Sequence, residues 1–169
     1  MSVPPEIIGR FDLPNDPQKP LHIPKLAERG RPKMSIYLVA YLAAGLVFCL
    51  LDFIWLTVLA KDFYQSQIGS LMLAEPKLNA AAVFYVLYLF GLLMFAMIPA
   101  LQAQNFSIAI GLGALLGLIA YATYDLSNLA TLKGWSLYLS LVDIAWGAFV
   151  SASASTAGYF AARALAKLS

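Results

Sequence analysis

Charged residues are scarce in this sequence and make up only 12% of its 169 residues. A soluble globular domain carries about a quarter charged residues, so this composition argues against a chain surrounded by water. The net charge is +2 and is dispersed along the chain, which excludes the concentrated basic surface of a nucleic-acid-binding protein. Because 61% of the residues are hydrophobic, we expect the lipid bilayer to surround most of the protein.

Cysteine and histidine are almost absent, with one residue of each type, Cys49 and His22. One cysteine can form neither an intramolecular disulfide nor a thiolate metal site. His22 lies before the first apolar run, so no membrane-embedded histidine is available for haem, chlorophyll or a transition metal. The acids of the apolar runs have no nitrogen or sulfur partners for zinc. The sequence therefore predicts no metal and no cofactor, and leaves room only for a bound lipid.

Four long apolar runs account for most of the chain. Each approaches or exceeds the ~20 residues that a helix needs to cross ~30 Å of hydrocarbon. Because the runs are apolar on all faces, they match helices and not the alternating strands of a barrel. The sequence predicts an all-α membrane protein, a four-helix bundle with spans at about 35–60, 80–101, 108–129 and 137–162.

The first 33 residues differ in composition and hold seven of the nine prolines. Proline disfavours helix at the preceding residue, so we expect residues 1–33 to form an extended cytoplasmic tail and residues 34–169 to form the membrane domain. Eight lysines and arginines fall on the side of both termini, against three on the other side, Lys61, Lys77 and Lys133. The positive-inside rule then predicts that both termini are cytoplasmic.

Three acids, Asp52, Asp125 and Asp143, fall within the apolar runs. Acids inside a membrane are costly and usually face protein or water, so each is a candidate functional residue. From their positions in the spans, all three belong to the outward-facing half of the bilayer. Asp52 and Asp143 each begin an Asp-x-x-Trp unit, which ends at Trp55 and Trp146. The two spans run in opposite directions, so the units either form an inverted pair or reflect interfacial tryptophans and bonded acids.

The third span carries a polar group of residues close to Asp125. Tyr121, Asp125 and Asn128 share one helix face with Tyr124 beside it, and Lys133 follows. This cluster could bind a polar head group or relay protons, or could serve only as a hydrogen-bonded network between helices.

Small residues recur at intervals of four in the third and fourth spans. The stripes predict close contact between helices, and their members are Gly113, Gly117, Gly147, Ser151 and Ser155.

The longest polar stretch in the spans, Tyr121–Trp135, carries a family resemblance together with Leu51–Leu56 and Val142–Gly147. On these residues the chain from about Met34 onwards resembles a bacterial family of small four-span membrane proteins of unknown function. The resemblance implies a four-helix inner-membrane protein. It implies no activity and no catalytic residues, and it does not extend to residues 1–33.

Three functions remain open at this point. The sequence favours a non-catalytic accessory or assembly subunit of a membrane complex, because a proline-rich arm loses little entropy when it orders on a partner. The expected contacts of that arm with other membrane subunits are Ile7, Ile8, Phe11, Leu13, Leu21, Ile23 and Leu26. The alternatives are a small proton-coupled transporter or channel that uses the three acids, and an enzyme that acts on a lipid or quinone.

Overall fold

The computed structural model describes residues 34–168, and every long element in this range is a helix, with no strand. Four helical segments are long and apolar enough to cross a membrane, which confirms the predicted all-α, four-span architecture. They are Met34–Leu59, Leu78–Ala103, Phe106–Thr131 and Leu137–Leu168. The predicted tail, with Ile7, Ile8 and its other proposed contacts, lies outside the described residues, so its role stays a prediction.

Large apolar side chains cover the outside of these helices. Leu46, Leu87 and Leu141 are 71%, 64% and 58% exposed, although each lies within an apolar span. Such a surface would be an aggregation hazard in water. It is the expected surface where lipid is the solvent and where every backbone group is satisfied inside a helix.

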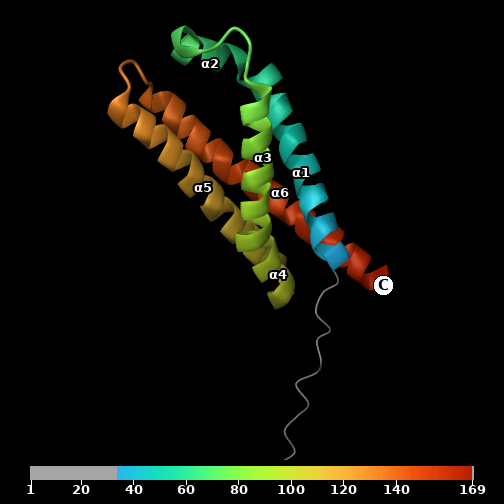
Figure 1. The fold of residues 1–169 in the computed structure, drawn as a ribbon. Helices are drawn as coiled ribbons and strands as arrows, with labels where there is room; N and C mark the ends of the chain where they lie inside the picture. The colour runs from blue at the N-terminus through green and yellow to red at the C-terminus, as the bar shows by residue number, and fades with distance from the viewer. Residues whose placement is uncertain (1–33, 169) are drawn as a thin grey trace, which may run out of the picture. The chain divides into compact units, whose positions relative to one another are not determined.

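Helix α6 (Leu137–Leu168) is the central element of the bundle. Its two extensive contacts are with α5 (Phe106–Thr131) and α1 (Met34–Ile54), whereas α3 (Leu78–Leu92) touches α1 at only a few residues. Figure 1 shows α6 running behind α3, with α1 and α5 on either side. The second span is held mainly through its later part, η3 (Leu93–Met97) and α4 (Ile98–Ala103), which pack against α5 and α6. The α3 end of this span is therefore the loosely packed part of the bundle.

The close contact between α5 and α6 depends on glycine. A methyl group at Gly113 would lie 2.6 Å from Ser155 Oγ and 2.9 Å from the carbonyl oxygen of Ser151. A methyl group at Gly117 would collide with the carbonyl of Gly147. The five small residues that the sequence predicts for packing therefore meet along one interface, at the backbone separation that small residues permit.

Two spans contain a π-helical turn that the sequence does not predict. In η1 (Trp55–Leu59), the N–H of Ala60 donates to the carbonyl of Trp55 at 2.7 Å. In the second span, η3 directly precedes α4, which has Pro99 in its first turn, and proline has no N–H to continue the α-helical ladder. Such wide turns often occur at functional sites, and η1 supplies Trp55 to the site described below.

The last span is longer than expected, because α6 continues to Leu168 instead of ending near residue 162. Arg163 and Lys167 end the apolar run but do not end the helix, since both residues are good helix formers. Before the second span, α2 (Lys61–Ile68) and η2 (Gly69–Leu71) cross the end of the bundle. Helix α2 is two-sided: Lys61 and Asp62 are exposed, while Phe63 and Tyr64 are half-buried.

Candidate functional site

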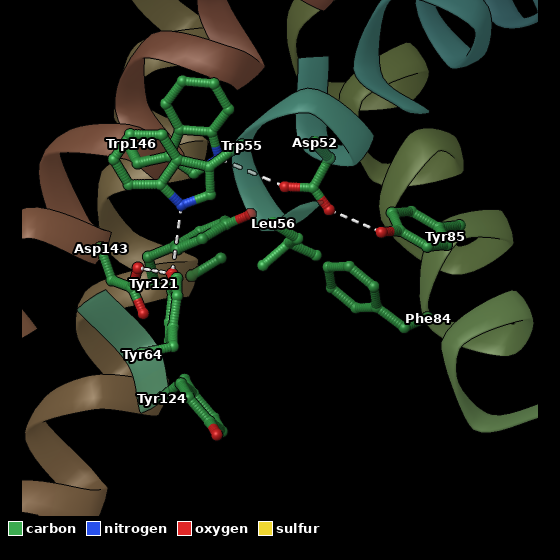
Figure 2. A pocket seen from close by; sticks show the side chains of 11 residues that line it. Asp52, Trp55, Leu56, Tyr64, Phe84, Tyr85, Tyr121, Tyr124, Asp143 and Trp146 are labelled. Atoms are coloured by element: carbon green, nitrogen blue, oxygen red, sulfur yellow. Dashed lines mark hydrogen bonds between the residues drawn. The ribbon is translucent and has the colours of Figure 1, made fainter. Parts of the chain in front are cut away.

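A cleft of about 570 Å³ lies at the end of the bundle that α2 covers. All four spans and α2 contribute to it, because α3 leaves the bundle open where its contact with α1 is slight. Figure 2 shows two carboxylates and a group of aromatic rings around this space. The lining residues are Asp52, Trp55, Leu56, Tyr64, Phe84, Tyr85, Ala120, Tyr121, Tyr124, Asp143 and Trp146.

Asp52, in the last turn of α1, is 6% exposed and is held by two helices. Its Oδ2 accepts a hydrogen bond from the Tyr85 hydroxyl of α3 at 2.5 Å. Its Oδ1 accepts one from Trp146 Nε1 of α6 at 3.2 Å. Asp52 thus ties α1 to both of its neighbours at the level of the cleft.

Asp143, near the start of α6, is also 6% exposed, and a side chain of α2 forms a hydrogen bond with it. The Tyr64 hydroxyl donates to Asp143 Oδ1 and accepts a hydrogen bond from Trp55 Nε1 at 3.2 Å. Burial, and then the hydrogen bond to Asp143, raise the pKa of Tyr64 above its ordinary value. The Tyr64 hydroxyl therefore stays protonated and serves Asp143 as a donor. In Figure 2 no bond from the residues drawn reaches the second oxygen of Asp143.

The two Asp-x-x-Trp units are joined crosswise. Trp146 of the second unit bonds Asp52 of the first, while Trp55 of the first reaches Asp143 of the second through Tyr64. The two indoles stack between them with centroids 4.3 Å apart and planes 9° from parallel. Because α1 and α6 are antiparallel neighbours, each aspartate lies level with the tryptophan of the other helix. The units therefore have the local arrangement of an inverted pair.

The cleft is open on its apolar side. Leu56, Phe84 and Tyr124 line it and are 46%, 44% and 59% exposed. They lie about 5–10 Å from the ends of their spans at 1.5 Å per residue. A 26-residue span is about 39 Å long, whereas the hydrocarbon layer is ~30 Å thick. The opening therefore lies close to the edge of the hydrocarbon layer, on the side of the bundle that α2 covers.

The structure separates the other predicted polar residues from this cleft. Asp125 is fully buried beside Ser140 and Trp135, and neither of its oxygens accepts a hydrogen bond within the described residues. Asp125, Asn128 and Lys133 do not belong to the lining, and Lys133 is exposed. The sequence cluster therefore divides, and only Tyr121 and Tyr124 join Asp52, Asp143 and their tryptophans.

Several lining residues do not stand out in the sequence. Tyr64 and Tyr85 bond the two acids, but they come from the connection and from the second span, where no periodic signal marks them. Phe84, Leu56 and Ala120 look like ordinary lipid-facing or packing residues. Tyr64 had one available signal, its place in a short amphipathic segment beside the acidic spans.

The cleft has no metal-binding character in the part of the chain that the structure describes. Residues 34–168 contain no group of three histidine, cysteine or acidic side chains that could hold an ion. No lysine, arginine or histidine of residues 34–168 is among the lining residues. The cleft therefore offers carboxylates, phenols and aromatic faces.

Comparison with protein families shows which family these helices belong to. Residues 37–160 match the model described as a predicted membrane protein, DUF2177. The chain belongs to this family. The family description gives a membrane location and no activity, and the matched range contains all of the cleft residues. No curated protein and no solved structure matches the chain.

Proposed function

We propose that this membrane protein binds the polar head group of an amphiphile in the cleft and performs no catalysis. The observation that carries the proposal is a cavity of about 570 Å³ with two buried acids, open at Leu56 and Phe84 at membrane depth. Ligand cavities usually measure ~300–1,000 Å³ and combine apolar walls with a few polar groups. An amphiphile matches both the polar and the apolar part of the cavity, because its head group reaches the acids and its chain leaves between the exposed side chains.

The distribution of charge supports binding over transport. Asp52 and Asp143 lie at one end of the bundle, and Arg163 lies near the other end. Between these two levels, the described spans contain no acidic or basic residue. The core between them holds Phe48, Leu92 and Val150, which are fully buried, and its polar groups are neutral hydroxyls such as those of the bonded pair Tyr88 and Ser151. A proton or ion path through one copy would need ionisable groups along its length.

The chemistry of the lining supports binding over catalysis. The described lining contains no cysteine, serine or histidine that could act as a nucleophile or as a general base near neutral pH. Asp52 and Asp143 already hold hydrogen bonds from tyrosine and tryptophan. These bonds fix the position of the carboxylates, as a binding site requires.

The proposal includes a cellular setting. We place the protein in a bacterial inner membrane with both termini in the cytoplasm, as its lysine and arginine distribution favours. The cleft would then face the outer leaflet. An accessory role in a larger complex is compatible with this binding site, and it depends on residues 1–33, which lie outside the described residues.

Filling the cleft tests the proposal. Ala120 of α5 lines the cavity, whereas Leu118 of the same helix is 46% exposed and lies outside the lining. Native mass spectrometry of the purified full chain should show a retained amphiphile in the wild type and in Leu118→Trp, and its loss in Ala120→Trp. Equal retention in all three proteins would contradict binding in this cleft.

A further inference from the structure

The polar groups of the cleft select the kind of head group that it can bind. Among the residues that the structure describes, two acids line it and no base does. A carboxylate has about four acceptor sites, whereas Asp52 receives two hydrogen bonds and Asp143 receives one within the described residues. The site therefore has unused acceptors, and no described base balances the negative charge that the two carboxylates carry when ionised. An anionic head group would meet repulsion here.

The apolar part of the lining has the same preference. Seven of the eleven lining residues are aromatic, from Trp55 and Tyr64 on one side to Phe84 and Tyr85 on the other. Aromatic faces attract a cation within about 6 Å of the ring centre, by about 0.5–2 kcal/mol. Carboxylates surrounded by aromatic rings are a recognition pattern for ammonium and quaternary ammonium groups.

We propose that the amphiphile bound in the cleft carries a cationic amine head group, a protonated or quaternary ammonium. This inference rests on the proposed binding function and specifies its ligand. The ammonium lies between Asp52 and Asp143, against the rings of Trp55, Tyr121 and Trp146. The hydrocarbon chain leaves past Leu56 and Phe84 into lipid. The bound cation also offsets the cost of two acids inside the membrane, which have no basic partner in the described part of the lining.

Fluorescence quenching by brominated amphiphiles tests the charge of the ligand. The chain has three tryptophans, so Trp135→Phe leaves only the two in the cleft as reporters. Three probes share one dodecyl chain brominated next to the head group, and they carry trimethylammonium, a neutral glucoside or a carboxylate. In dodecyl maltoside, the trimethylammonium probe should quench saturably, with a half-saturation about tenfold below that of the glucoside.

Matched acid variants separate specific binding from partition into the micelle. Asp143→Asn keeps an acceptor for Tyr64 but removes the charge, and it should raise the half-saturation of the ammonium probe by about tenfold. Asp62→Asn removes an exposed acid outside the cleft and should change nothing. If Asp143→Asn proves unstable, Ala120→Phe replaces it, since it fills the cleft without adding a tryptophan, and it should abolish saturation.

The outcomes distinguish this inference from the proposed function. Tighter saturable binding of the glucoside or the carboxylate would overturn the cationic ligand and leave head-group binding intact. Failure of all three probes to saturate would refute head-group binding itself. Competition by phosphatidylethanolamine, and not by phosphatidylglycerol with the same acyl chains, would identify a phospholipid as the source of the amine. Binding of the ammonium probe without such competition would indicate a free lipophilic amine.

Discussion

Trp146 on α6 donates its indole N–H to Asp52 on α1, 94 residues earlier in the chain, at 3.2 Å. This bond is the direct half of the crosswise connection, and the Trp55–Tyr64–Asp143 chain is the bridged half. The same residues hold two antiparallel helices together and line the cleft. Stability and ligand binding should therefore depend on a shared set of side chains.

A double-mutant cycle on Asp52 and Trp146 measures this coupling. Asp52→Ala and Trp146→Phe each remove the interhelical bond, so the double variant should lose less stability than the sum of the two changes. We expect a coupling energy of about 0.6–1.7 kcal/mol from unfolding in detergent. Trp135 bonds Ser140 instead, so Asp52→Ala with Trp135→Phe should be additive. Additivity in both pairs would contradict the Asp52–Trp146 bond.

Glycine variants test the α5–α6 interface. Gly117→Ala should lower the free energy of unfolding by about 1–3 kcal/mol, because its methyl group meets the backbone of Gly147 and the helices must separate. Gly111 lies on the same helix with nothing within 4 Å of a built Cβ. Gly111→Ala should therefore cost nothing, and equal melting temperatures for the two variants would refute this close contact.

The division between what the sequence predicts and what it misses has a physical cause. Span positions and the α5–α6 packing depend on hydropathy and on small residues at intervals of four, which are local patterns. The Asp-x-x-Trp units are visible because both members lie on one helix. Tyr64 and Tyr85 join the site only through tertiary packing, since α2 folds over the bundle end and α3 departs from α5. Asp125 is the opposite case. The sequence places it on the same helix face as Tyr121, but helix periodicity alone does not show that Asp125 lies outside the cleft lining.

Orientation in the membrane is a separate prediction. With both termini in the cytoplasm, a cysteine at Lys133 should react with an impermeant maleimide in intact cells, and a cysteine at Lys167 should react only after lysis. Both variants need Cys49 replaced by alanine, because its thiol is exposed on α1. Labelling of Lys167→Cys in intact cells would reverse the topology and place the cleft in the inner leaflet.

The predicted role of residues 1–33 is tested by truncation. Removal of the tail should leave the four helices inserted in the membrane but release the protein from other membrane subunits during purification in mild detergent. A second variant, with Ile7, Ile8 and Phe11 changed to serine, keeps the length and the prolines and should also release it. Unchanged co-purification of both variants would remove the tail as an attachment device.

The most direct test of the account is a high-resolution structure of the full chain in lipid nanodiscs that contain the amine-headed probe. We expect a head group between Asp52 and Asp143, against the stacked Trp55 and Trp146, with its chain leaving between Leu56 and Phe84. A cleft closed by α3 against α5, or one that holds no amphiphile while the probe saturates the surrounding lipid, would contradict it.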